Sequence, residues 1–357
     1  MSVLANPFCR TDFEEYEQEN HLNHRFPGNP QDVLIKVEAS SVNPLDLMMT
    51  KGYGDRILKN LRENNHSLVL GRDFSGTVVG TGMDAQNDFK IGDQVYGATF
   101  PSSQGSHTEF VTASKFSVAK KPKNLNHLEA ASLPFTALTA WSAMMVSAGM
   151  SSESQNKNPQ FKVLVLGASG GVGTFAVQLL KALNYSVVAV SQDFEMVVKL
   201  GADVVLDYTA PSYQSDLQKL ATFDVIFDFA GLENQALKFM DLLRPWSNAK
   251  LVTLMSPLLR STDQDGLIAG SLKTLASVVA TNAQTALSKN GTSYRYGYFM
   301  LNPYALQTIT NLVEKGKVIY NFAIDPKFIL HFKPFHTLSD QTSYSRSIQT
   351  GTFTCCL

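Results

Sequence analysis

A glycine-rich turn between a short apolar segment and a helical one is the feature that most constrains this chain. Residues 162–166 predict a buried strand, residues 174–183 predict a helix, and Gly167-Ala168-Ser169-Gly170-Gly171-Val172-Gly173 joins them. Such a turn exposes backbone N–H groups at a helix N-terminus, where the helix dipole favours an anion. Glycines remove the Cβ atoms that would keep a pyrophosphate away, and Gly173 lets the helix pack close to the strand. The turn therefore predicts a dinucleotide site, with a tight turn that binds no ligand as the alternative.

The residues on either side of this turn predict a parallel sheet. Short apolar segments follow one another, and residues 174–183 and 195–200 between them predict helices. Strands without polar alternation are typical of a parallel sheet covered by helices on both faces, as in doubly wound α/β folds. The predicted strands are residues 162–166, 186–190, 204–206, 223–227 and 250–254.

The N-terminal third of the chain has a different pattern. Its segments rich in β-branched residues and glycine predict strands with frequent turns, which indicates a barrel-like β domain. Residues 128–149 then predict a helix, and the polar residues 151–159 predict a loop. At about 150 residues per domain, a chain of 357 residues is expected to form two domains. The predicted strands of the β domain are residues 32–43, 71–82, 91–97 and 109–111.

The charge and cysteine counts exclude several classes of protein. Lys and Arg total 30 and Asp and Glu total 31, so the net charge of −1 gives no overall field for holding nucleic acid or an anionic membrane. Three cysteines, Cys9, Cys355 and Cys356, are too few for a disulfide framework or a four-cysteine zinc site. We therefore expect no nucleic-acid partner and no structural zinc.

One uncharged stretch, residues 130–152, is long enough to span a bilayer. It contains a proline, a glycine and seven Ser or Thr residues, and apolar residues such as Leu138 and Trp141 recur at helical spacing. It therefore predicts a buried core helix and no stable membrane span. Residues 12–19 include five acidic residues, so we expect neither a mitochondrial presequence nor a secretory signal at the N-terminus.

The glycine-rich turn also fits Gly-x-Ser-x-Gly, the pattern of a hydrolase nucleophile elbow. That alternative makes Ser169 a nucleophile and needs a downstream histidine, which here means His331 or His336.

The end of the second predicted strand favours the dinucleotide hypothesis. That strand ends at Ser191, whose hydroxyl can donate to a 2′-phosphate that an aspartate would repel. Ser191 therefore favours NADPH over NADH, although Asp193 follows two residues later and weakens this inference. No Tyr-x-x-x-Lys occurs in the chain, which argues against a short-chain dehydrogenase.

Several separate motifs resemble the medium-chain dehydrogenase/reductase superfamily, in its quinone-oxidoreductase branch. Ala-Ser-Ser-Val-Asn-Pro-Leu-Asp at residues 39–46 and Leu-Gly-Arg-Asp-Phe-Ser-Gly at residues 70–76 resemble motifs of the branch's barrel. Within the branch, the chain is most similar to the reticulon-interacting (NOGO-interacting) mitochondrial proteins, over residues 30–354. The other motifs that carry the resemblance are residues 91–95, 130–134, 138–141, 166–175, 191–193, 199–203, 207–208 and 294–296.

The resemblance implies an α/β fold of two domains. Residues 1–133 and 302–357 would form a split, GroES-like, β-rich catalytic domain, and residues 134–301 a Rossmann NADPH-binding domain with a doubly wound parallel sheet. Residues 332–335 resemble the strand that returns to the catalytic domain. We recognise neither the family's first strand nor its terminal strand, and we expect both to be missing, as in a shortened splice form or an imperfect gene model.

The residues at the family's zinc positions imply chemistry without a metal. Zinc-dependent members use a Cys after the barrel strand and a His-Glu after a glycine, whereas this sequence has Asn43 and Arg72-Asp73 there. We expect Arg72 and Asp73 to form a structural ion pair, with an acid/base pair as the alternative. Without a Lewis acid, alcohol oxidation loses its usual activation, but a quinone or an enone is already polarised and needs only an oriented hydride donor. The resemblance thus implies an oxidoreductase that delivers hydride from NADPH to a quinone or an enone, in the ubiquinone pathway of mitochondria.

The resemblance also implies roles for individual residues. Asn43 and Tyr53 match catalytic positions near the nicotinamide, where Tyr53 would donate a proton or stack on the acceptor. A surface tyrosine without a role is the alternative for Tyr53, and a plain core residue is the alternative for Phe299. The implied cofactor-binding residues are Ser169, Gly170, Gly171, Val172 and Gly173 at the pyrophosphate, Ser191 and Tyr208 near the adenosine phosphate, Ala230 and Gly231 after the fourth strand, and Gly297 and Phe299 on the late strand near the nicotinamide.

Two other functions stay open beside the reductase. One is a nucleotide-binding interaction protein of the reticulon-partner type with little turnover, and the other is the serine hydrolase. The resemblance further implies a homodimer, a reticulon-type protein partner and a mitochondrial location. The lack of a recognisable presequence leaves a cytoplasmic location open for this chain.

Overall fold

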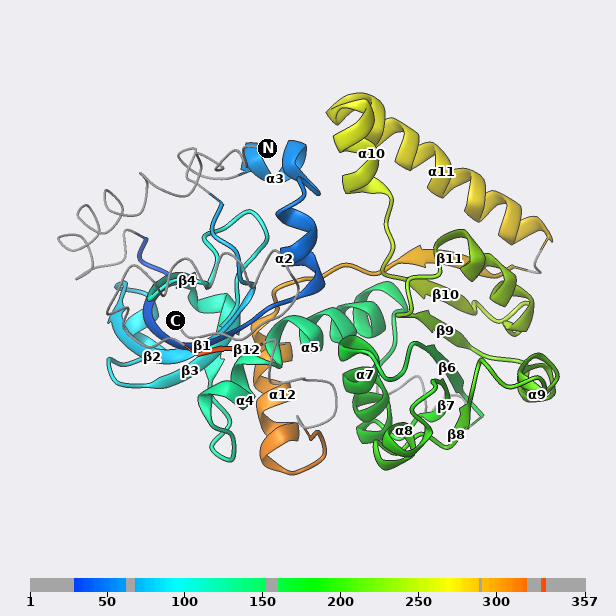
Figure 1. The fold of residues 1–357 in the computed structure, drawn as a ribbon, viewed down its shortest axis with the longest axis horizontal. Helices are drawn as coiled ribbons and strands as arrows, with labels where there is room; N and C mark the ends of the chain where they lie inside the picture. The colour runs from blue at the N-terminus through cyan, green and yellow to red at the C-terminus, as the bar shows by residue number, and fades with distance from the viewer. Residues whose placement is uncertain (1–28, 62–67, 152–159, 289–290, 320–328, 332–357) are drawn as a thin grey trace, which may run out of the picture.

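The computed structural model describes residues 29–61, 68–151, 160–288, 291–319 and 329–331, which form two β-sheets with helices around them. An antiparallel sheet, sheet A, lies on the left in Figure 1 and a parallel sheet, sheet B, on the right, with α5 (Pro134–Trp141) between them. The fold class is therefore the predicted one. The strands expected to be missing before residue 30 and after residue 335 lie outside the described residues.

Sheet A is built around one long strand, β1 (Asp32–Ser41). One edge of β1 pairs with β2, and the other pairs with β4 over its first half and with β12 over its second half. Val33, Ile35 and Val37 alternate along β1 and are buried in the core of this sheet, as expected for a half-buried strand. The other strands of sheet A are β2 (Asp73–Thr81), β3 (Gln94–Ala98), β4 (Phe110–Ser114), β5 (Val118–Lys120) and β12 (Ile329–His331).

A short strand, β12 (Ile329–His331), returns to sheet A and pairs antiparallel with β1. The returning strand was predicted directly after it, at residues 332–335. Residues 332–335 lie outside the described part of the chain. The other helices around this sheet are α2 (Pro44–Met49), α3 (Asp55–Leu61), α4 (His127–Ala131) and α12 (Pro303–Glu314), with 3-10 turns at Ala85–Asn87 and Lys115–Ser117.

The single helix predicted for residues 128–149 is in fact three consecutive elements, α4, α5 and a π-helix (Ser142–Ser147). Pro134 explains the break between α4 and α5, because proline lacks the N–H that would continue the hydrogen bonds of α4. It occupies the first turn of α5, where helices tolerate it. In the described segments, no helix is both long enough and apolar enough to cross a membrane.

Sheet B has the strand order β11-β10-β9-β6-β7-β8, and all its strands are parallel. The chain starts in the middle and reverses direction between β6 and β9, which is the order of a Rossmann domain. Three strands have the predicted bounds, and β9 and β10 differ from them by one or two residues. The strands are β6 (Lys162–Leu166), β7 (Ser186–Val190), β8 (Val204–Leu206), β9 (Val225–Asp228), β10 (Lys250–Thr253) and β11 (Ser293–Tyr296).

Helices cover both faces of sheet B, each over its own core. The larger core includes α5, α7 and α12 and continues to Tyr96 and Ala98 of sheet A, so the two sheets share buried side chains. The smaller core lies on the other face, around Leu217 and Met240. The helices are α7 (Gly171–Ala182), α8 (Phe194–Lys199), α9 (Tyr213–Leu220), a 3-10 helix (Glu233–Leu242), α10 (Leu258–Asp265) and α11 (Leu267–Ser288).

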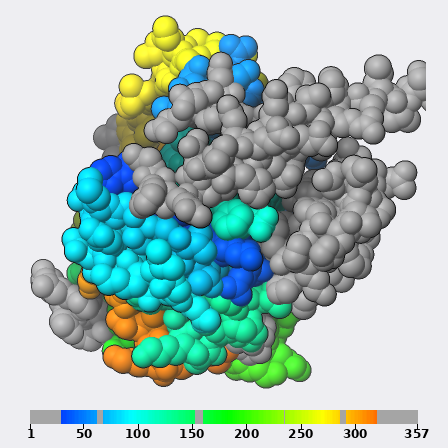
Figure 2. All heavy atoms as spheres, turned by 90° about the vertical axis from the view of Figure 1, so that its left-hand side faces the viewer, coloured from blue at the N-terminus to red at the C-terminus, as the bar shows by residue number. Residues whose placement is uncertain are grey.

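α12 packs against β3 of sheet A, and α10 beside sheet B contacts α3 in the other part of the molecule. The hydroxyl of Tyr96 in β3 lies 3.1 Å from the backbone oxygen of Leu306 and 3.0 Å from Thr310 Oγ1, both in α12. Asp263 of α10 accepts from the N–H of Gly54 at the start of α3. Figure 2 shows these neighbours from the side of sheet A, with α12 below the strands and α10 and α11 above them. The exact domain boundaries, at 133/134 and 301/302, stay a prediction.

Candidate active site

The glycine-rich turn lies where the strand order of sheet B reverses. Gly167 has φ +76°, and a Cβ there would lie 2.7 Å from the amide nitrogen of Ala230, so the turns after β6 and β9 are in direct contact. A Cβ on Gly173 would lie 2.1 Å from the Gly167 carbonyl oxygen. Only glycine therefore lets α7 start this close to β6, as the sequence predicted. Ligands of open α/β sheets bind at this switch point, outside the carboxyl ends of the strands.

The start of α7 leaves backbone donors facing outward from the turn. The first intrahelical bond runs from the Thr174 N–H to the Gly170 oxygen, so the N–H groups of the preceding first turn have no acceptor within the helix. Gly170 and Gly171 are exposed, and a Cβ on Gly170 would meet nothing nearer than 3.5 Å. Ser169 and Val172 are partly exposed beside them. These donors fit an anionic diphosphate, as predicted for a dinucleotide cofactor.

The residues predicted at the adenosine end follow β7 and β8. Ser191 is buried, its N–H donates to Leu206 at the end of β8, and its Oγ accepts from the Asp193 N–H at 2.9 Å. Asp193 caps α8 by accepting from the Met196 N–H. Asp193 thus serves as a helix cap, and the Ser191 hydroxyl oxygen is bound within the turn after β7. Tyr208 lies after β8 and is 54% exposed.

A buried carboxylate that sequence analysis missed shapes the turn after β9. Asp228 ends β9 and accepts from the N–H groups of Ala230 and Leu232 and from Thr253 Oγ1. Gly231 in this turn has φ +73°. Asp228 therefore fixes the turn that carries Ala230 and Gly231. Its only signal in the sequence is an acidic residue at the carboxyl end of an apolar strand.

Gly297 and Phe299 lie just beyond the late strand. They were predicted on that strand, but β11 ends at Tyr296, and the Gly297 N–H still donates to Thr253 at 2.8 Å. The chain then turns towards α5, where Phe299 stacks on Phe135 with ring centroids 4.5 Å apart. Phe135 itself, in the first turn of α5, was not predicted as a site residue.

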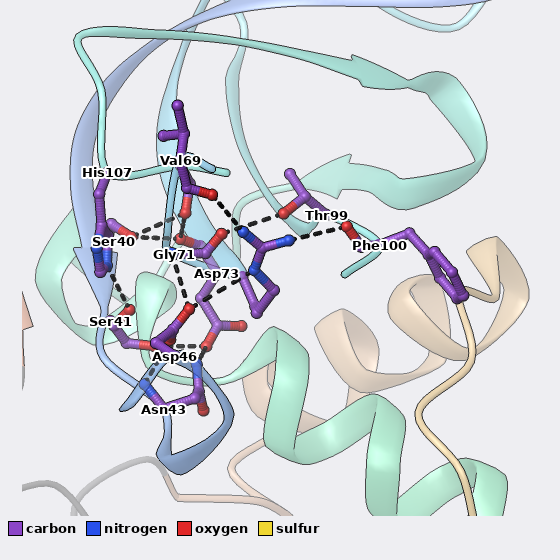
Figure 3. A network of polar contacts seen from close by, with 12 residues as sticks. Ser40, Ser41, Asn43, Asp46, Val69, Gly71, Asp73, Thr99, Phe100 and His107 are labelled. Carbon is purple, nitrogen blue, oxygen red and sulfur yellow. Dashed lines mark hydrogen bonds and ion pairs between the residues drawn. The ribbon is translucent and has the colours of Figure 1, made fainter. Parts of the chain in front are cut away.

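Asn43 and Asp73 meet where β1 ends and β2 begins (Figure 3). Asn43 Nδ2 donates to Asp73 Oδ2 at 2.7 Å, and Ser41 Oγ donates to the same oxygen. The Phe135 N–H donates to Asp73 Oδ1. Burial raises the pKa of Asp73 to about 7, although the hydrogen bonds from Ser41, Asn43 and Phe135 favour its charged form.

The ion pair predicted between Arg72 and Asp73 is wrong. The chain bends at Arg72, before β2 begins at Asp73, and the arginine side chain pairs with Asp46 instead. The Arg72 guanidinium lies 3.6 Å from Asp46, and it donates to the carbonyl oxygens of Val69 at 2.7 Å and Phe100 at 2.9 Å. Asp46 also accepts from the N–H groups of Asn43 and Gly71, so it fixes the backbone around Asn43.

Tyr53 is half-buried in the turn between α2 and α3. Burial raises its pKa, and its charged neighbours are Arg260 and Asp263 of α10. Tyr298, next to Phe299 in the chain, is also near enough to influence it. The structure thus places Tyr53 where the catalytic part of the chain meets α10 and the segment after β11.

The donor atoms at the family's zinc positions do not fit a zinc ion. An amide stands at Asn43 and a cationic guanidinium at Arg72, whereas Zn²⁺ binds thiolate, imidazole and carboxylate groups. His107 lies nearby, with Nε2 3.1 Å from the Ser41 backbone oxygen, and burial lowers its pKa. Across the described ranges, no three His, Cys, Asp or Glu side chains lie together as a possible metal site.

The antiparallel sheet, the Rossmann sheet and the glycine-rich turn define a medium-chain dehydrogenase/reductase. Residues 29–123 match the family model of the alcohol dehydrogenase GroES-like domain, and residues 171–289 match that of the zinc-binding dehydrogenase. The structure of the quinone oxidoreductase from Coxiella burnetii has a similar fold, with a TM-score of 0.60, 24% identity, and coverage of 83% of this chain and 82% of that chain.

Curated relatives narrow the class to a family. NAD(P)H oxidoreductase RTN4IP1, mitochondrial, of Danio rerio is 40% identical over 314 residues, which is 84% of this chain and 79% of the relative. Reticulon-4-interacting protein 1, mitochondrial, of Caenorhabditis elegans is 32% identical over 304 residues, 82% of this chain and 80% of the relative. The chain belongs to this family of NAD(P)H oxidoreductases.

The serine hydrolase alternative does not agree with this arrangement. Ser169 lies in the turn after β6 of sheet B, whereas His331 belongs to β12, which pairs with β1 in sheet A. His336 lies outside the described residues. Family membership and the position of His331 both favour the oxidoreductase.

Proposed function

We propose that the chain is a zinc-independent, NADPH-dependent reductase that delivers hydride to a quinone or an enone. The observation that carries this proposal is the junction at Phe135. Its N–H binds Asp73, which also holds Asn43, and its ring stacks on Phe299 beyond the Rossmann sheet. The residues implied for the acceptor and for the nicotinamide thus come together between the two domains.

The choice of acceptor follows from the side chains at the junction. A hydride acceptor without a metal must already be electron-poor, and quinones and enones satisfy that condition. Three apolar side chains that neighbour Asn43, Tyr53 or Phe299 in the sequence are exposed, which suits an aromatic or aliphatic acceptor. They are Met48, Tyr298 and Met300, between 39% and 46% exposed.

NADPH would supply the hydride, and the protein would bind and orient it. The N–H groups at the start of α7 would hold the pyrophosphate, with Ser169 beside them. Phe299 and Gly297 would lie along the nicotinamide, and Asn43 would bind the acceptor or the carboxamide from the other domain. Tyr53 would then donate the proton that completes reduction, or stack on the acceptor.

The preference for NADPH over NADH rests on Ser191. An anionic side chain at this buried position would repel a 2′-phosphate and accept from a ribose hydroxyl instead. Ser191→Asp is therefore expected to weaken NADPH binding by about tenfold or more while sparing NADH. Titration of both nucleotides by fluorescence measures this, and unaltered NADPH binding would count against the 2′-phosphate role.

The reaction itself is tested on the purified chain. NADPH is titrated by fluorescence, and the loss of its absorbance is followed with a panel of quinones and enones. Gly171→Leu should abolish NADPH binding, because the added side chain would fill the exposed cradle at the start of α7. Ala280→Leu adds similar bulk to an exposed position of α11 and serves as the matched control. Absence of NADPH binding by the unaltered chain would rule the proposal out.

The biological setting is a further part of the proposal. The mitochondrial names of the relatives support a role in that compartment, and the ubiquinone pathway is the setting we propose for a quinone reductase there. The name of the nematode relative favours an alternative, a nucleotide-binding partner of a reticulon with little turnover. NADPH binding without oxidation of NADPH by any quinone or enone would favour that alternative.

A further inference from the structure

The Asp73 carboxylate connects segments that are far apart in the chain. It receives hydrogen bonds from Ser41 at the end of β1, from Asn43 before α2 and from the N–H of Phe135 in α5. All three partners are donors, and Asp73 is completely buried. A buried carboxylate is tolerated only when such donors compensate for lost hydration. Loss of any of the three contacts would therefore destabilise the fold.

The backbone of Asp73 is fixed as firmly as its side chain. Its carbonyl oxygen accepts from Ser40 Oγ at 2.7 Å and from Ser106 Oγ at 2.6 Å. Figure 3 shows Asp73 at the centre of this network, with Ser40 and Ser41 on one side and Asn43 below. Asp73 therefore has little freedom to move, and the groups that it holds share its position.

The two oxygens of Asp73 hold groups from the two domains. Oδ2 binds the amide of Asn43, and Oδ1 binds the backbone of Phe135, whose ring stacks on Phe299. Thr136, the next residue, would lie 3.2 Å from a Cβ on Gly171 in the glycine-rich turn. One carboxylate thus links the Asn43 amide to the segment that touches both the cradle and Phe299.

We propose that Asp73 is a positioning residue for hydride transfer, which sets the Asn43 amide at a fixed distance from the Phe135–Phe299 stack. This inference rests on the proposed function, in which Asn43 and Phe299 flank the reacting groups. Asp73 itself is buried and acts through its partners. A misplacement of about 1 Å in such a site is enough to slow the reaction by about 100-fold.

Exchanging the amide and the carboxylate tests the proposal. In the native chain, Asp73→Asn keeps an acceptor for Phe135 but turns an amide donor towards the Asn43 donor. In an Asn43→Asp background, two carboxylates face each other. The same Asp73→Asn change then gives the carboxylate at position 43 an amide donor from position 73. We therefore expect Asp73→Asn to lower kcat in the native chain, by about 100-fold, and to raise it in the Asn43→Asp background.

The measurements are kcat with a short-chain benzoquinone and the dissociation constant of NADPH for the native chain and the three variants. We expect Asp73→Asn to change kcat in opposite directions in the two backgrounds, while the dissociation constant of NADPH stays the same in every variant. Asp224→Asn is the control, since Asp224 is a buried carboxylate that binds the Lys162 N–H and Arg244 far from the junction, and it should lower stability without lowering kcat.

Three results would overturn the inference. One is an Asp73→Asn change that has the same sign in both backgrounds, and another is a loss of NADPH affinity in proportion to kcat, which would indicate a merely structural role. The third applies if the single variants do not fold: it is a double variant, Asn43→Asp with Asp73→Asn, that also fails to fold or shows no turnover. A native chain that binds NADPH but reduces no acceptor would instead overturn the proposed function, and this inference with it.

Discussion

Asp73 shows how a single buried group makes the molecule sensitive to pH. Burial raises its pKa from an ordinary value of 3.8 to about 7, so the folded chain binds this proton more tightly than the unfolded chain does. The resulting contribution to stability is complete below the unfolded pKa and is lost as the pH rises through the folded pKa. Asp73 therefore stabilises the fold least at neutral and alkaline pH.

Comparison of the native chain with Asp73→Asn isolates this effect. The free energy of unfolding of the native chain, relative to that of Asp73→Asn, should fall by about 3 kcal/mol between roughly pH 5 and pH 8. Urea unfolding followed by circular dichroism at several pH values measures it. A difference that stays constant over this range would mean that Asp73 does not take up a proton in the folded chain.

For single residues, the sequence predicts which residues belong to the site better than it predicts which side chains bind one another. Gly173 was identified from its position in a motif, and it lies at the close approach of α7 to β6, as predicted. The catalytic role of Asn43, from another motif, stays a prediction. Arg72 and Asp73 were paired because they are neighbours, yet the chain bends at Arg72 and the arginine pairs with Asp46. The contact between Asp73 and Phe135 joins residues 62 positions apart, and no local pattern reveals such a contact.

Among the elements, continuous apolar strands were the most predictable. β6, β7 and β8 have the predicted bounds, because a strand buried on both faces must be apolar at every position. α11 was not predicted, although Ile268, Leu272, Leu275 and Val279 recur at helical spacing. These four side chains are 59–79% exposed, whereas Gly270 and Thr274 are buried. The apolar periodicity therefore indicates the helix but not the face that it buries.

The start of α7 gives a prediction about the packing of a helix against a strand. Gly173→Ala would bring a Cβ within 2.1 Å of the Gly167 carbonyl oxygen, which is backbone and cannot move aside without shifting the turn. We expect a loss of about 1–3 kcal/mol in the free energy of unfolding. Gly170→Ala is the control, because a Cβ at Gly170 has room. Since Gly170 is the N-cap residue of α7, alanine there should lower the free energy of unfolding by at most about 1 kcal/mol. Equal losses in the two variants, measured by urea unfolding, would refute the packing argument.

At the scale of the whole molecule, the free edge of sheet B decides how two copies can pair. Ser293 and Gly297 donate towards β10, so the N–H of Tyr294 between them points to the outer edge. There it donates to Asn282 Oδ1 of α11 at 3.1 Å, and the Tyr296 carbonyl accepts from Ser147 Oγ of the π-helix at 3.0 Å. Side chains thus occupy two of the outward backbone groups that a second copy of β11 would need, which is one way in which proteins protect sheet edges.

This protection predicts that two copies do not pair through β11. We expect the native chain to form no dimer of this kind in light-scattering measurements during gel filtration, and we expect Ser147→Ala combined with Asn282→Ala to free the edge and increase association. Arg295→Cys in β11 provides the check, because a dimer built on this edge would bring the two introduced thiols together. Efficient disulfide formation between copies that keep Ser147 and Asn282 would show that the capped edge still pairs, and the homodimer implied by the family resemblance would then be built on β11 after all.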